Sequence, residues 1–304
     1  MMMNTKNGIK TNKFPMAFEI QTTNRCNGRC TICPHRYLSK TTTDMTTELF
    51  EKIIQQISAF DNKDIRIIPY LNGEPFLDKQ FVERLNYIRE LCPTAVIEIS
   101  TNLSRLTKEI VVSLLENEVY DLRISCFGFT EKAYRNVMQG LDFNMFRKNL
   151  KFLLDENRKS GKLKKISLTM IQYPGFDLND YELAEAFCKE NGINLNFWEY
   201  LDRAGNVPVY SNQIVVTEDD EARKRYTCAQ NRETRMHILA NGSVVMCCQD
   251  WQAQYIMGDA NRDDLLAIWN NEKYQSLRNQ LEVKGVPYPE LCKKCKILLE
   301  GFKG

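Results

Sequence analysis

Six short β-rich runs alternate with helical patterns between Ala17 and Glu199, and this alternation constrains the fold more than any other feature. The segments between the runs place apolar residues near i, i+3, i+4 and i+7, for example Phe50, Ile53 and Ile57. Strands separated by helices are typical of parallel βα units with right-handed crossovers. The pattern predicts an α/β fold and leaves open a doubly wound sheet or a partial barrel. The runs are AFEIQT (17–22), IRIIPYL (65–71), AVIEIS (95–100), DLRIS (121–125), KISLTMI (165–171) and INLNFWEY (193–200).

The pattern changes after about Tyr200. The run MHILANGSVVMC (236–247) indicates a β-hairpin with an Asn-Gly turn, and DDLLAIWNNEKYQSLRNQL (263–281) indicates helix before a terminal CKKC. A small segment rich in cysteine is typical of a module stapled by metal. We therefore expect a main domain over residues 1–215 and a small cysteine-rich α+β domain over residues 216–304.

Charge and hydropathy exclude several classes of protein. The net charge is +2, from 41 basic and 39 acidic residues, so no basic field predicts binding to nucleic acid or to an anionic membrane. The N-terminal run MMMNTKNGIKTNKF lacks the apolar centre of a signal peptide. No run approaches the roughly 18 apolar residues of a membrane span. We expect a cytoplasmic protein.

Eleven cysteines in a reducing compartment are poor candidates for structural disulfides, and most of them fall into two groups. The first group is Cys26, Cys30 and Cys33 in the segment RCNGRCTICP. The second group is Cys228, Cys247, Cys248, Cys292 and Cys295. The chain has only two histidines, which makes triads and metal sites based on histidine poor predictions.

The first group follows the first strand, at the end where α/β folds place their chemistry. Clustered thiolates select soft metals such as zinc, copper(I) or iron–sulfur clusters. A [4Fe–4S] cluster normally takes four thiolates, so three leave one iron open for a substrate or cosubstrate. A zinc knuckle is the alternative that spacing alone allows.

The spacing Cys26-x3-Cys30-x2-Cys33 after a first strand resembles the radical S-adenosylmethionine (SAM) superfamily. The resemblance implies a partial (β/α)6 barrel and a [4Fe–4S] cluster whose open iron binds the amine and carboxylate of SAM. Reductive cleavage of SAM in that family gives a 5′-deoxyadenosyl radical. Further weak matches follow successive strands in the family's order, over roughly 200 residues, and their order strengthens the resemblance.

These matches are the predicted SAM-binding residues. LNGEP resembles the family's GGEP turn, with Asn72 in place of its first glycine, and STN and ISCFGF follow the third and fourth strands. The family pattern Y-x-x-I-R-G corresponds to YRNVMQG here, with Met138 at the arginine position. We expect Arg135, one turn earlier, to replace that arginine in binding SAM. The alternative is that Arg135 is an exposed helix residue without a role in binding. The predicted set is Gly73, Glu74, Pro75, Ser100, Asn102, Ser125 and Arg135.

The second cysteine group can close a four-ligand site, and zinc fits its spacing as well as an iron–sulfur cluster does. The C-terminal region resembles the twitch (SPASM-like) domain of radical SAM enzymes, which holds an auxiliary [4Fe–4S] cluster. The resemblance implies the ligands Cys228, Cys247, Cys292 and Cys295 and a single auxiliary cluster, because the further cysteines of a longer SPASM domain do not follow. Which of the tandem Cys247 and Cys248 is the ligand stays open.

The layout resembles the radical SAM dehydrogenases and epimerases of aminocyclitol and aminoglycoside pathways. We expect hydrogen abstraction from a carbon of a small polar substrate, a sugar or aminocyclitol, and epimerisation with Cys248 as hydrogen-atom donor. Two-electron dehydrogenation through the auxiliary cluster is the alternative, with Asp250 as the base. The structural alternative for Cys248 is a small buried residue beside the cluster. The structural alternative for Asp250 is a carboxylate that caps the end of the hairpin.

Two further hypotheses stay open. A maturase that modifies a peptide often carries a leader-binding domain, and only 25 residues precede Cys26. A zinc-stapled binding protein without chemistry is the other. The expected partners are a small-molecule substrate and an external one-electron donor such as flavodoxin or ferredoxin.

Overall fold

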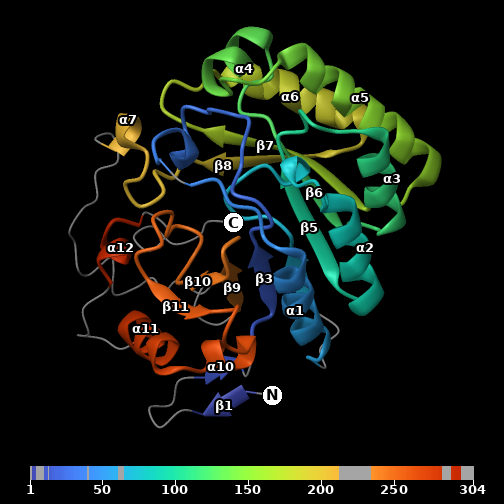
Figure 1. Ribbon diagram of the computed structural model, residues 1–304. Helices are drawn as coiled ribbons and strands as arrows, with labels where there is room; N and C mark the ends of the chain where they lie inside the picture. The colour runs from blue at the N-terminus through green and yellow to red at the C-terminus, as the bar shows by residue number, and fades with distance from the viewer. Residues whose placement is uncertain are drawn as a thin grey trace.

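The computed structural model describes residues 2–4, 10–12, 14–39, 41–60, 65–211, 234–282 and 289–295. Six parallel strands lie side by side in chain order (Figure 1). A doubly wound sheet would reverse that order at a switch point, so the sequential order is that of a partial (β/α)6 barrel, which confirms the expected fold class. The strands are β3 (Ala17–Ile20), β4 (Arg66–Ile68), β5 (Val96–Thr101), β6 (Asp121–Ser125), β7 (Lys165–Gln172) and β8 (Asn194–Glu199).

Helices cover the outer face of this curved sheet (Figure 1). Gly161 and Gly192 follow α5 and α6 with φ of +63° and +64°, as the sequence predicts for left-handed helix stops. Side chains of Thr46, Thr107, Thr130 and Asp142 accept hydrogen bonds from the first turns of α1, α3, α4 and α5. The helices are α1 (Thr47–Ser58), α2 (Phe81–Leu91), α3 (Lys108–Glu116), α4 (Glu131–Val137), α5 (Phe143–Ser160) and α6 (Leu178–Asn191).

The two faces of the parallel sheet differ in chemistry because side chains alternate along each strand. Phe18 and Ile20 of β3 are fully buried in the apolar core shared with the helices. Glu19, between them, faces the opposite, inner side. Glu98 of β5 lies on the same inner side and pairs with Arg66 and with Arg123, the latter at 2.8 Å. The barrel interior is therefore polar and charged.

The C-terminal strands extend the same sheet. β9 (Arg235–Ile238) runs parallel to β3, and β10 (Ser243–Val245) and β11 (Ile256–Asp259) add antiparallel strands beyond it. Gly242 has φ +89° in the turn between β9 and β10, as the Asn-Gly pair predicts. The predicted boundary at 215/216 lies outside the described residues.

The predicted helical stretch 263–281 is two helices, α10 (Leu265–Trp269) and α11 (Glu272–Glu282). Asn271 separates them because its side chain accepts from Tyr274 N at 3.0 Å and donates to Met257 O at 2.7 Å. No described helix is long and apolar enough to cross a bilayer. The remaining elements are β1 (Met2–Asn4), β2 (Lys10–Asn12), α7 (Pro208–Ser211), α12 (Glu290–Lys293) and the 3-10 helices η1 (Pro34–Arg36) and η2 (Pro75–Leu77).

Candidate functional site

The three thiols of the first cysteine group converge in the loop after β3. A Cβ atom on Gly28 would lie 3.6 Å from Cys26 Sγ and 3.5 Å from Cys30 Sγ. The Gly28 N–H donates to Cys26 Sγ at 3.4 Å, and Cys33 N donates to Cys30 O at 3.2 Å. The predicted ligands are thus gathered by the loop backbone, not spread along it.

The environment of these thiols suits a bound cation. Burial raises the pKa of Cys26 to about 12, with smaller contributions from Glu74 and Cys33. Burial also raises the pKa of Cys30 well above its usual value, and Cys33 and Cys26 add to the effect. Thiolates are the form that binds metal, so iron must supply the positive charge that offsets burial and mutual repulsion. Three clustered soft donors fit a [4Fe–4S] cluster with one open iron.

The cysteine loop is tightly packed against the segment after β4. A Cβ atom on Gly73 would lie 2.6 Å from Thr23 O and 2.9 Å from Arg25 O, so only glycine fits. Glu74 N donates to Arg25 O at 2.8 Å. These backbone contacts join the predicted SAM-binding turn to the residues just before Cys26.

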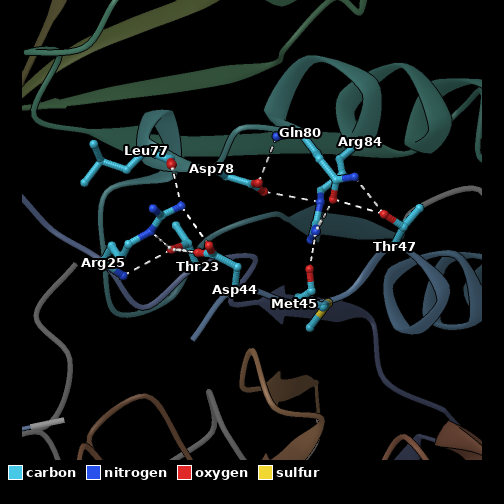
Figure 2. Close-up of polar contacts among 9 residues, drawn as sticks. All are labelled: Thr23, Arg25, Asp44, Met45, Thr47, Leu77, Asp78, Gln80 and Arg84. Atoms are coloured by element: carbon cyan, nitrogen blue, oxygen red, sulfur yellow. Dashed lines mark hydrogen bonds and ion pairs between the residues drawn. The ribbon is translucent and has the colours of Figure 1, made fainter. Parts of the chain in front are cut away.

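Side chains reinforce this junction (Figure 2). Arg25 donates to Leu77 O at 2.9 Å and pairs with Asp44 at 2.8 Å, and Thr23 Oγ1 donates to Asp44 at 2.6 Å. Behind them, buried Arg84 pairs with Asp78 at 3.3 Å and donates to Met45 O. Figure 2 therefore shows a polar frame that holds the two loops in one geometry.

The Glu74 carboxylate joins the ends of β4 and β5. It accepts from Thr101 Oγ1 at 2.6 Å, from Asn102 N at 2.7 Å and from Phe76 N at 3.2 Å. The side chain is 2% exposed, and burial raises its pKa to about 7. Both carboxylate oxygens of Glu74 already accept hydrogen bonds from the protein. We therefore expect the predicted turn Gly73–Pro75 to contact SAM through its backbone atoms.

The other predicted polar residues also line strand ends. Asn102 donates to Asn27 Oδ1 at 3.1 Å, which links the end of β5 to the cysteine loop. Ser100 hydrogen-bonds the phenol of Tyr70, whose pKa is raised, chiefly by burial. Ser125 ends β6 and is half-buried.

Arg135 differs from these residues because its side chain is exposed and already paired. Its side chain is 61% exposed and pairs with Glu131 at 2.7 Å, one turn earlier on α4. This is the exposed helix arginine that the sequence left as the alternative, and nothing in its contacts supports a role with SAM. The following segment instead contacts the cysteine loop through its backbone, with Arg29 N donating to Gln139 O at 2.6 Å and Thr31 N to Val137 O at 2.9 Å. Sequence patterns carried no signal of that contact.

The second cysteine group also gathers. Burial raises the pKa of Cys247, and Cys248, Cys292 and Cys295 raise it further, which requires these thiols to be close. Cys295 N donates to Cys292 O at 3.1 Å, so the terminal CxxC forms a compact turn. Cys228, the fourth predicted ligand, lies outside the described residues. The described thiols fit an iron–sulfur cluster as well as they fit zinc.

Cys248 also lies close to two residues of the sheet. Its Sγ, a Glu19 carboxylate oxygen and a His237 ring nitrogen all lie within 4.8 Å of one another. Glu19 and His237 are register partners on β3 and β9, so they share the inner face of the sheet. The sequence analysis missed both residues, because only the long-range pairing of β3 with β9 brings them together.

Asp250 closes its own loop. Its two carboxylate oxygens accept from Gln254 N and Tyr255 N, each at 2.9 Å, and its side chain is buried. This geometry matches the capping alternative. The role of Asp250 as a base stays a prediction that the contacts do not support.

Comparison with known protein families agrees with this arrangement. Residues 20–188 match the radical SAM superfamily, and residues 228–296 match the SPASM iron–sulfur cluster-binding domain. A radical SAM domain binds a [4Fe–4S] cluster and SAM, and a SPASM domain binds auxiliary iron–sulfur clusters. The expected family and cofactors are therefore confirmed.

Individual relatives span most of the chain. The S-adenosyl-L-methionine-dependent 2-deoxy-scyllo-inosamine dehydrogenase of Niallia circulans is 24% identical over 91% of both chains. The crystal structure of BtrN in complex with AdoMet and 2-DOIA has a TM-score of 0.64 and is 20% identical, covering 94% of both chains. Streptococcus suis SuiB bound to precursor peptide SuiA has a TM-score of 0.71 at 19% identity, covering 95% of this chain and 71% of SuiB. Since a family model matches more than half of its residues, the chain belongs to the radical SAM superfamily and carries a SPASM domain.

Proposed function

We propose that this radical SAM enzyme epimerises a carbon centre of a small polar substrate, a sugar or aminocyclitol. When bound, the first cluster and SAM supply the 5′-deoxyadenosyl radical that removes a hydrogen atom from the substrate. Cys26, Cys30 and Cys33 would hold that cluster, and the backbone of Gly73–Pro75, with Ser100, Asn102 and Ser125, would hold SAM. Aminocyclitols are favoured because a relative that covers 91% of this chain is named for such a substrate.

One observation carries the choice of epimerisation: Cys248 lies beside residues of the barrel's inner face. Cys248, Cys292 and Cys295 all raise the pKa of Cys247, and Cys248 also lies within 4.8 Å of Glu19 and His237 on the inner face of the barrel. We therefore assign Cys247, with Cys228, Cys292 and Cys295, to one auxiliary cluster. Cys248 is the spare thiol, and its weak S–H bond can return a hydrogen atom to a substrate radical from the opposite face.

Dehydrogenation is the second candidate, because the Niallia circulans relative is a dehydrogenase. That reaction needs a base to remove a proton while the electron passes to the auxiliary cluster. The sequence analysis predicted Asp250 as this base, yet both of its carboxylate oxygens accept hydrogen bonds from backbone N–H groups. The contacts of Asp250 therefore do not support it as that base. The hypothesis of peptide modification has weaker support still, because it rests only on the likeness of the fold to SuiB.

Three further assignments belong to the same proposal. The chain divides into a radical SAM core over residues 1–215 and an auxiliary-cluster domain over residues 216–304. An external one-electron donor, such as flavodoxin or ferredoxin, reduces the first cluster. The substrate is a small molecule that enters the polar interior of the barrel.

Turnover in D₂O tests the proposal. Reconstituted enzyme with SAM, reductant and a panel of aminocyclitols should place one solvent deuterium at an inverted carbon, because the Cys248 thiol exchanges with solvent. Cys248→Ala should still form 5′-deoxyadenosine but no epimer. An oxidised ketone product formed equally by both proteins would establish dehydrogenation instead.

A further inference from the structure

Three side chains that can bind a metal ion meet on the inner face of the sheet. One ligand atom from each of Glu19, His237 and Cys248 lies within 4.8 Å of the other two. Glu19 and His237 are register partners on β3 and β9, and Cys248 follows β10. A carboxylate, an imidazole and a thiol are the three kinds of side chain that bind zinc in proteins.

His237 gives an independent reason to expect a ligand here. Its side chain is fully buried, and neither ring nitrogen has a hydrogen-bond partner among the described residues. Its Nε2 lies 3.6 Å from Glu19 Oε2, which is too long for a hydrogen bond. A buried polar group without a partner is costly, so such a group in a native structure calls for an explanation.

The separation of these two atoms suits two ligands of one metal ion. Nitrogen and oxygen ligands lie about 2.0–2.2 Å from zinc, so two such atoms around a tetrahedral ion are roughly 3.3–3.7 Å apart. The 3.6 Å between His237 Nε2 and Glu19 Oε2 falls within that range. Cys248 Sγ lies within 4.8 Å of a ligand atom of each residue, so a side-chain movement of about 1 Å completes the set.

Neighbouring residues hold these ligands in place. Arg235 pairs with the other oxygen of Glu19 at 2.6 Å, which leaves Oε2 directed toward His237. The Gln249 side-chain amide donates to Cys248 Sγ at 3.7 Å, and a metal-bound thiolate can accept the same contact. The Glu19 side chain is 13% exposed, so an ion can reach the site from the interior of the barrel.

We propose that Glu19, His237 and Cys248 bind a zinc ion whose fourth tetrahedral position is open to water. Zinc replaces the proton of the Cys248 thiol, which passes to solvent, and nothing is oxidised or reduced. The site itself stands on the contacts above, whereas its effect on turnover rests on the proposed function. A zinc-bound Cys248 has no S–H hydrogen to return to a substrate radical, so zinc should inhibit epimerisation reversibly.

Zinc content and X-ray absorption at the zinc edge test the site without turnover. Protein with both clusters reconstituted is dialysed against zinc and then against buffer that contains a weak chelator. Wild type should retain one zinc ion per chain with its iron content unchanged. The zinc spectrum should show one sulfur at about 2.3 Å and nitrogen or oxygen ligands at about 2.0–2.2 Å.

Variants identify the ligands. Cys248→Ser should lose the sulfur from the zinc spectrum. Glu19→Gln and His237→Gln should each weaken zinc binding by more than about tenfold, because even residues that only orient a metal ligand are worth that much. Cys92→Ser is the control, since it removes a buried thiol outside the cluster, and it should bind zinc as wild type does.

Three results would overturn the proposal. The first is iron-loaded wild type that retains no zinc, and the second is a zinc spectrum with several sulfurs, which would place the ion at the second cysteine group. The third is wild-type zinc binding in both Glu19→Gln and His237→Gln. If a variant fails to fold, the wild-type spectrum still decides. Because no substrate or SAM is involved, failure here is distinct from failure of the D₂O experiment.

Discussion

Replacing Gly73 by alanine should separate the cysteine loop from the predicted SAM-binding turn. The added Cβ would lie 2.6 Å from Thr23 O and 2.9 Å from Arg25 O, two backbone atoms that cannot rotate away. Close C···O contacts in proteins are about 3.3 Å or longer, so the two segments must part by roughly 0.4–0.7 Å. That movement strains or breaks the hydrogen bond from Glu74 N to Arg25 O, now 2.8 Å.

The cost follows from two contributions. Overpacking costs about 1–3 kcal/mol and a lost buried hydrogen bond about 1 kcal/mol, so Gly73→Ala should destabilise the protein by about 2–4 kcal/mol. At roughly 2–4 °C per kcal/mol, the apparent Tm should fall by about 5–15 °C. Iron bound at the first cluster should fall as well, because the moved segment leads directly into Cys26.

Thermal unfolding and iron content, measured anaerobically after reconstitution, check this prediction. Gly192→Ala is the control, because no atom lies within 4 Å of its Cβ position and its φ of +64° makes strain the only cost. That strain costs roughly 1–2 kcal/mol and lies far along the chain from the clusters. If Gly73→Ala had the same Tm and iron content as wild type, the argument that the close contact between these two loops assembles the site would be refuted.

Three further predictions concern other parts of the site and its supports. Burial raises the pKa of Glu74 from 4.5 to about 7, so its contribution to stability is full below pH 4.5 and lost as the pH rises through 7, a change of about 3 kcal/mol in all. Denaturation at pH 5.5 and 8 covers about 2 kcal/mol of this change, which wild type should show and Glu74→Gln should not. Arg135→Ala removes an exposed ion pair, so the free energy of unfolding should change by no more than about 1 kcal/mol and the affinity for SAM should stay unchanged. A Kd for SAM weakened about tenfold, measured by calorimetry, would instead show that Arg135 binds SAM. Asp180→Asn should cost about 1–3 kcal/mol in urea unfolding without loss of iron, because buried Asp180 accepts from Phe129 N and Thr130 N; unchanged stability would contradict this role.

Local patterns predicted the strands and helices of the α/β fold because these elements are built from local signals. Alternating strands and helices, glycine stops at Gly161 and Gly192, and the Asn-Gly hairpin all depend on residues close in sequence. The choice between an open sheet and a barrel needed the order of strands in space, which periodicity does not contain. The spacing of Cys26, Cys30 and Cys33 carried the cluster prediction for the same local reason.

The parts that sequence missed depend on contacts between distant segments. Glu19 and His237 meet only because β9 pairs with β3 across more than two hundred residues, and no local pattern marks that pairing. The closeness of Cys248 to Glu19 and His237 follows from the same packing. Arg135 and Asp250 were chosen by proximity in sequence, and the structure gives each a local partner that accounts for it without chemistry.

Formation of 5′-deoxyadenosine tests the central claim most directly, namely that three thiols hold a cluster able to cleave SAM and start hydrogen abstraction. Anaerobically reconstituted protein, given SAM, a strong reductant and a panel of sugars and aminocyclitols deuterated at their ring carbons, should yield 5′-deoxyadenosine that contains deuterium, detected by mass spectrometry. Cys26→Ala should yield none. Iron-loaded wild-type protein that yields no more 5′-deoxyadenosine than Cys26→Ala with every substrate in the panel would contradict the account.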